Sequence, residues 1–250
     1  MTTDKLVRRL GKTTKRLGVV REFDVLELLI EELRQRGRYS PVALDVVAAA
    51  TARRRTVATA RVKAKVTHSK LRRLAGRLED VVERLEADEA SATAKSSADT
   101  RAWRWGLDAR LIRRSGQLRA AIEVTGPMYC PGQLHDVRVA LKKCRYAFEL
   151  AQEAGREGSG ADLATLRAMQ DSLGRLHDLE VLIEWTRDAQ ASAAPPELAT
   201  WGLGSLVRDL ENECRLLHAR YMSHRSKLLG VCDRAAGRRP AVAAPRRAVG

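Results

Sequence analysis

The feature that most constrains the fold of this chain is an apolar repeat with helical spacing between residues 134 and 151. Its members recur at intervals of three and four residues: Leu134, Val137, Leu141, Cys144, Phe148 and Ala151. Because an α-helix has 3.6 residues per turn, these side chains share one face of a helix. The stretch therefore predicts an amphipathic helix that buries this face.

A second stripe follows the first at an offset of one residue and consists of charged side chains: His135, Arg138, Lys142, Arg145 and Glu149. One residue is about 100° around a helix, so this stripe borders the buried face instead of pointing directly away from it. Cations stacked at i,i+4 destabilise a helix by a few tenths of a kcal/mol unless an anion lies among them. We interpret the stripe as an anion site; a solvated basic face is the alternative.

Composition predicts an all-α protein with a polyanionic partner. Aromatic residues make up 4% of the 250 residues, and strict apolar–polar alternation is absent. The net charge of +15 favours nucleic acid, an anionic membrane surface or an inorganic polyanion as the partner. No apolar run approaches the ~18 residues of a membrane span, and no signal peptide is recognisable. Together with four cysteines that lack close pairing, this predicts a soluble, cytoplasmic protein with reduced thiols.

Long helices separated by glycine or proline account for the first third of the chain. One helix is predicted from Thr3 to Arg36. A second begins near Pro41 and runs past His68, with Gly76 as the expected place for any break. Its apolar seam predicts that it packs along its whole length: Leu71, Leu74, Leu78, Val81 and Leu85.

Residues 87–100 are small and polar, so they are predicted to link a first helical half, 1–86, to a second, 101–233. Asp99 or Thr100 is expected to cap the helix that follows the linker. The Ala-, Pro-, Gly- and Arg-rich tail, 234–250, is predicted to be disordered.

An internal repeat relates the two halves, because residues 17–26 match residues 173–182 position by position. Both copies carry a mid-helix glycine, Gly18 or Gly174, which predicts close helix approach there. Arg21 and His177 occupy the same offset and are expected to face a common central space. The same register would place the first-half partner of the His135 helix before Met1. The first half is therefore expected to lack its first helix, either because the chain starts late or because the half works without it.

Further basic stripes at helical spacing occur on other predicted helices: Lys12 and Arg16; Arg54, Arg61, Lys65 and His68; Arg215 and His218. If these stripes converge, they form a groove or pore lined with cations that a polyanion could enter. Arginine suits this role because its planar guanidinium binds phosphate oxygens bidentately. Solvated outer faces remain the alternative interpretation.

Two other classes of function compete with polyanion binding as explanations of the sequence. His135-Asp136 and His177-Asp178 are pairs of the kind that ligate metal in phosphohydrolases, but the surrounding Arg and Lys would repel a cation. A nucleic-acid-binding protein fits the charge, yet aromatic residues for base stacking are few, and the four tryptophans are expected mostly in core seams. We therefore predict no catalysis, no metal and no cofactor.

The residues of the His135 helix resemble the hallmark helix of the CHAD family (conserved histidine α-helical domain). The matching positions are His135, Arg138, Lys142, Lys143, Arg145, Tyr146 and Glu149, and the repeated Leu-Gly segments resemble a second family motif. The resemblance implies two pseudo-symmetric bundles of long helices around a basic central cavity. It also implies non-catalytic binding of inorganic polyphosphate, with association with polyphosphate granules as a further expectation. By the same resemblance the hallmark cations and Tyr146 would line the site, with Arg21 and His177 as weaker members.

Overall fold

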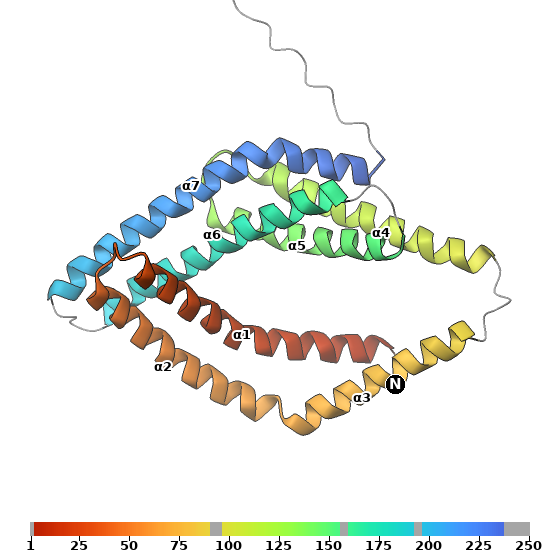
Figure 1. Cartoon of the computed structure of the whole chain (residues 1–250), viewed down its shortest axis with the longest axis horizontal. Helices are drawn as coiled ribbons and strands as arrows, with labels where there is room; N and C mark the ends of the chain where they lie inside the picture. Colours follow the sequence, from red (N-terminus) through yellow and green to blue (C-terminus); the bar gives the residue numbers. More distant parts are fainter. Residues whose placement is uncertain (1–2, 91–96, 156–159, 193–196, 238–250) are drawn as a thin grey trace, which may run out of the picture. The chain divides into compact units, whose positions relative to one another are not determined.

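The computed structural model describes residues 3–90, 97–155, 160–192 and 197–237, and these residues form seven α-helices without a strand (Figure 1). The helices are α1 (Thr3–Gln35), α2 (Pro41–Lys65), α3 (His68–Ala90), α4 (Ser97–Val124), α5 (Pro131–Glu153), α6 (Gly160–Ser192) and α7 (Glu197–Ala235). The predicted all-α class is confirmed.

The chain divides into two compact units that are not contiguous in sequence. Unit 1 comprises residues 1–95 and 178–211, and unit 2 comprises residues 96–177 and 212–250. Helices α6 and α7 therefore each contribute one segment to unit 1 and another segment to unit 2. The division into sequence halves 1–86 and 101–233, their pseudo-symmetry and the central cavity stay predictions.

Unit 1 is built around the antiparallel pair α1 and α2, which lie side by side in Figure 1. Phe23 of α1 packs edge-on against Trp185 of α6, with ring centroids 5.0 Å apart. α2 begins at Pro41 with Ser40 as its N-cap, whose Oγ accepts a hydrogen bond from the backbone N–H of Ala43. A Cβ at Gly202 of α7 would lie 2.9 Å from Ser40, so glycine is required where α7 crosses the start of α2.

Unit 2 has a continuous apolar core contributed by α4, α5, the first half of α6 and the end of α7. Ion pairs connect the helices around this core: Arg119 with Asp233, Arg175 with Glu213, and Arg234 with Asp162. The core fixes the position of α5 against α6.

The break in the second predicted helix lies at residues 66–67, not at Gly76. The backbone N–H of Val66 makes the last bond of α2, to the carbonyl of Val62 at 2.7 Å, and α3 begins at His68. The Lys70 ammonium, 3.1 Å from the carbonyl oxygen of Lys65, binds an oxygen that the interrupted helix leaves without a partner. Two consecutive β-branched residues, Val66 and Thr67, occupy the break, and β branching lowers helix propensity.

Several other expectations about packing are wrong. The apolar seam of α3 does not pack along its length, since Leu71, Leu78 and Leu85 are 38%, 38% and 62% exposed. A Cβ at Gly18 or at Gly174 would meet no described atom within 4 Å, so neither glycine marks a close helix contact.

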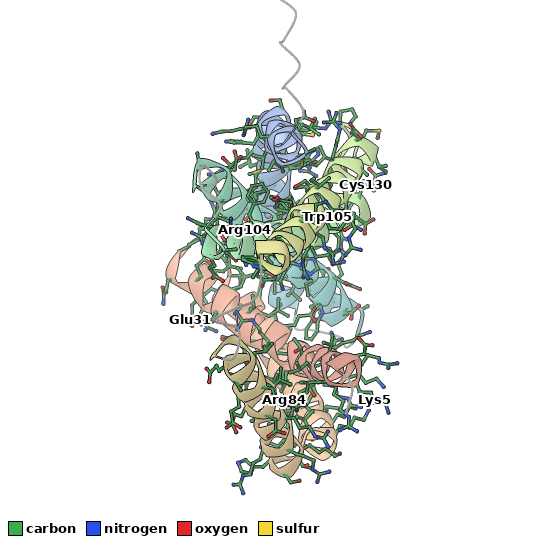
Figure 2. All side chains as sticks on the ribbon, turned by 90° about the vertical axis from the view of Figure 1, so that its right-hand side faces the viewer. Lys5, Glu31, Arg84, Arg104, Trp105 and Cys130 are labelled. Carbon is green, nitrogen blue, oxygen red and sulfur yellow. The ribbon has the colours of Figure 1, made fainter. Side chains whose placement is uncertain are left out.

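The tryptophans are mostly at the surface, contrary to expectation. The exposed ones are Trp103, Trp105 and Trp201; Trp105, at 76% exposure, projects from α4 near Arg104 in Figure 2. α4 begins at Ser97, so Asp99 and Thr100 lie within the helix and do not cap it.

The predicted linker and tail overlap the described helices only in part. α3 continues to Ala90 and α4 starts at Ser97, while the remaining linker residues, 91–96, lie outside the described residues. α7 includes Arg234 and Ala235, and residues 238–250 of the predicted tail also lie outside the described part of the chain.

Candidate anion-binding site

The apolar face predicted for α5 is buried as expected. Its core residues are Leu134, Val137, Leu141, Cys144, Ala147, Phe148 and Ala151. Proline at the first turn, Pro131, has the backbone geometry that helix starts favour and no N–H to leave without a partner. Burial raises the pKa of the Cys144 thiol to about 11, which fits an inert core thiol.

α5 lies antiparallel against α6, and this places the predicted cations along a seam between two helices. The rings of His135 and His177 approach with centroids 5.1 Å apart. Further along α5, Arg145 Nε donates to the side-chain oxygen of Gln170 at 2.7 Å. All of these residues belong to unit 2, and the residue numbers run in opposite directions on the two helices.

His177 is neutral at physiological pH in this arrangement. Partial burial, followed by the charge of Arg138 and the neighbouring His135, lowers its pKa to about 4. A neutral imidazole beside Arg138 can donate one hydrogen bond to an anion. A bound anion would favour the protonated form and add a second donor.

The depressed pKa of His177 predicts a pH dependence of stability. Between pH 6.5 and about 4 the unfolded chain protonates this histidine and the native chain does not, so the stabilising contribution present above pH 6.5 is lost as pH falls. We expect His177→Gln to reduce the slope of the free energy of unfolding against pH by up to about 1.4 kcal/mol per unit in this window. Urea denaturation at several pH values measures it. His68→Gln removes an exposed histidine instead and serves as the control; an unchanged slope in His177→Gln would contradict the assignment.

Arg145 is already bound within the protein, although the sequence predicted it as a phosphate ligand. Its guanidinium pairs with Glu149 and lies 4.4 Å from the centroid of the Tyr146 ring. Glu149 also binds Arg167 of α6 at 2.9 Å. Arg145 thus joins α5 to α6 and contacts the Tyr146 ring, and Glu149 already offsets its charge.

The remaining cations of α5 are available. Within the described residues, neither Arg138, Lys142 nor Lys143 has a carboxylate partner; Lys142 has only a cation–π contact, 5.9 Å from the centroid of the Tyr146 ring. His135, Lys142 and Lys143 are exposed, and Arg138 is half-buried. α5 therefore presents a row of cations whose charge the described part of the chain does not neutralise locally.

A second group of cations gathers in unit 1, in a groove of about 300 Å³ between α1 and α3. Its cationic lining residues are Arg9, Lys12, Arg16, Lys70, Arg73 and Arg77. In Figure 2 the side chain of Lys5 extends from the same end of α1. No acidic side chain lines the groove among the described residues, so it is a strongly positive concave surface.

The sequence predicts two of the α1 cations of this groove, Lys12 and Arg16, but not Arg9 or the three cations of α3. Lys70, Arg73 and Arg77 have the spacing i, i+3, i+7, which was visible in the sequence. On one continuous second helix these three cations fall outside the basic stripe that ends at His68. The break at residues 66–67 redirects α3 and brings these three cations beside α1.

Other predicted site residues of α2 fall in two places. Arg61 and Lys65 share with Arg16 a hollow of about 240 Å³ between α1 and α2. Arg54 instead binds Asp188 of α6 at 3.0 Å and covers the ring of Trp185, 4.5 Å from its centroid.

Comparison with known families adds to this geometry. The family model of the CHAD domain matches residues 2–187, which include α1 to α5 and most of α6. The chain belongs to the CHAD domain family. No curated protein and no solved structure matches the chain.

The CHAD match extends over both cation groups, whereas two predicted site residues lie downstream of it on α7. The Arg215 guanidinium donates to the side-chain oxygen of Asn212. His218 is buried between Tyr129 and Tyr221, with ring centroids 5.4 Å and 6.4 Å away, and burial lowers its pKa. With 9% of its surface exposed, His218 has the position of a core residue.

Two predicted site residues of this CHAD domain lie at the surface of other helices. His68 and Arg21 are both exposed, on α3 and α1. No helix in the described part of the chain is long and apolar enough to cross a membrane. Among the same residues, no three His, Cys, Asp or Glu side chains gather closely enough to hold a metal ion.

Proposed function

We propose that this CHAD domain binds inorganic polyphosphate without transforming it. The observation that carries the proposal is the cation row of α5, in which Arg138, Lys142 and Lys143 lack carboxylate partners among the described residues. Like charges at i,i+4 on one helix destabilise it, so an unpaired row beside a buried seam favours an external anion. The family membership supports the same ligand.

The chemistry of the row fits a linear chain of phosphates. Arg138 can bind two phosphate oxygens through its guanidinium, and Lys142 and Lys143 contribute charge with flexible reach. His135 and His177 add nitrogen donors at one end of the row. The groove between α1 and α3 supports binding of the same ligand class in unit 1. Association with polyphosphate granules belongs to this proposal.

Single-stranded nucleic acid is a second candidate, and the exposed tryptophans of α4 favour it. Trp103 and Trp105 are 46% and 76% exposed, and the guanidinium of Arg104 lies 5.9 Å from the centroid of the Trp103 ring. Exposed rings beside a cation can stack nucleobases, which polyphosphate lacks. The two ligands are therefore separable by competition.

The decisive test is a competition titration at physiological salt. Labelled long-chain polyphosphate bound to the protein is displaced by unlabelled polyphosphate, duplex DNA or a single-stranded oligonucleotide, all at equal concentration of phosphate groups. We expect polyphosphate to displace the label at roughly tenfold lower concentration than either nucleic acid. We also expect affinity to fall steeply as salt rises, because each phosphate contact releases counterions.

Equal displacement by all three polyanions would identify a general basic surface and refute the proposal. Preferential displacement by the single-stranded oligonucleotide, lost in Trp105→Ala, would instead establish the second candidate. Incubation of polyphosphate with protein and Mg²⁺ or Mn²⁺ is run in parallel. Release of orthophosphate above the protein-free blank would contradict the non-catalytic part of the proposal.

A further inference from the structure

Helices α1 and α6 are equivalent elements of the internal repeat. Each has 33 residues, and the matching segments, 17–26 and 173–182, begin in the fifteenth position of α1 and the fourteenth of α6. The register of the repeat can therefore be extended along both helices. It pairs Val7 with Leu163, and Leu17 with Leu173.

In unit 2 the structure shows what covers the face of α6 that includes Leu163 and Leu173. Gln170 and His177 contact α5 through Arg145 and His135, and Arg167 binds Glu149 of α5. Two leucines near these contacts on α6, Leu163 and Leu173, are 3% and 1% exposed and belong to the same core as the apolar face of α5. The face of α6 is therefore a helix-docking face, and α5 occupies it.

No described residue buries the equivalent face of α1. Val7 is 60% exposed and Leu17 is 44% exposed, although their counterparts on α6 are buried. The rest of this face consists of uncharged residues, namely Leu10, Gly11, Thr14 and Gly18, of which only Leu10 is half-buried. An uncharged stripe about 100° wide on a helix as basic as this one is typical of a packing face.

The glycines of this face leave room for a close partner. A Cβ at Gly11 or Gly18 would meet no described atom within 4 Å, and both residues are exposed. The backbone of α1 is therefore accessible to another helix at two points of the stripe about two turns apart, which glycine permits and larger residues obstruct.

We propose that the face formed by Val7, Leu10, Gly11, Thr14, Leu17 and Gly18 is a docking surface for an amphipathic helix that has the apolar and basic pattern of α5. The occupant is inferred from the repeat, since α5 covers the equivalent face of α6. A second copy of this chain cannot readily supply it, because the apolar stripe of its α5 is already buried, with Leu141 and Cys144 at 0% exposure.

Charge does not prevent this docking even though α1 is basic. The segment 131–153 has four Lys or Arg residues against three Asp or Glu residues, so its formal charge is 4 − 3 = +1. Such a helix adds little repulsion, and its apolar stripe would cover Val7 and Leu17. The inference stands independently of whether the protein binds polyphosphate.

The probe is a fluorescein-labelled peptide with the sequence of residues 131–153, titrated with the full chain and followed by fluorescence anisotropy. We expect saturable binding that Leu17→Glu weakens roughly tenfold or more, because docking would bury the new carboxylate in an apolar contact. Leu216→Glu is the matched control, since Leu216 is an exposed leucine of α7 at 72% exposure, and it should leave binding unchanged. Circular dichroism checks that both variants keep their helix content.

Every other outcome counts against the proposal. No binding of the peptide to wild-type chain would overturn it. Binding that Leu17→Glu does not weaken would mean that the peptide has displaced α5 from α6, which also overturns it. Light scattering of the wild-type chain is measured alongside: a dimer that Leu17→Glu dissociates would show that the face serves self-association instead.

Discussion

Charge reversal of Arg138 and Lys142 together is expected to weaken binding of long-chain polyphosphate roughly 100-fold at physiological salt. Hydrogen bonds to charged groups contribute about 1.5–3 kcal/mol each, and the double variant removes two such groups and adds two repulsive ones. Neither residue has a carboxylate partner among the described residues, so Arg138→Glu/Lys142→Glu disrupts no internal ion pair. Isothermal titration calorimetry measures the loss.

The control for this prediction changes the net charge equally. Arg220→Glu/Lys227→Glu alters two exposed cations of α7 in the same unit and should weaken binding only through the general loss of positive charge. A third variant, Arg16→Glu/Arg73→Glu, measures how much the groove between α1 and α3 contributes to the affinity for polyphosphate. If the α5 pair and the α7 pair lose equal affinity, the α5 row is not a site.

Leu141→Ala is expected to lower the free energy of unfolding by about 3 kcal/mol. Leu141 is fully buried in the core of unit 2, where truncation of leucine removes apolar contacts and leaves a cavity. Because Leu141 lies one residue before Lys142, loosening of this face should also disturb the cation row. Urea denaturation followed by circular dichroism measures the change.

Leu216→Ala is the control for the core prediction, since its side chain is largely exposed and should change stability by less than about 0.5 kcal/mol. A loss below about 1 kcal/mol in Leu141→Ala would show that α5 is not held by the core described above.

The sequence allowed α5 to be predicted almost completely. The six apolar residues of its predicted face, from Leu134 to Ala151, follow one strict spacing, and all six are buried. The ends of α1 were equally predictable, since Gly37, at φ +67°, follows the helix where a left-handed residue is needed. In both cases a local pattern was enough, and tertiary contacts reinforced it.

The predictions that were wrong or incomplete concern features that depend on contacts between helices. The seam of α3 has ideal heptad spacing, yet spacing alone does not supply a partner helix, and Leu85 remains exposed. The i,i+4 spacing of Arg145 and Glu149 was visible in the sequence, but the contacts of Arg145 with Gln170 and of Glu149 with Arg167 on α6 were not. His218 has the periodicity of a surface stripe, and only the packing of Tyr129 beside it shows that it is buried.

Because α6 and α7 each pass through both units, neither unit exists as one continuous piece of chain. A single protease cut between residues 90 and 97 would not release a complete unit. One fragment would retain Phe23 while the other retained its ring partner Trp185. The two fragments would stay bound to each other as a nicked but assembled protein, and fusion or truncation designs that preserve a unit must keep both of its segments.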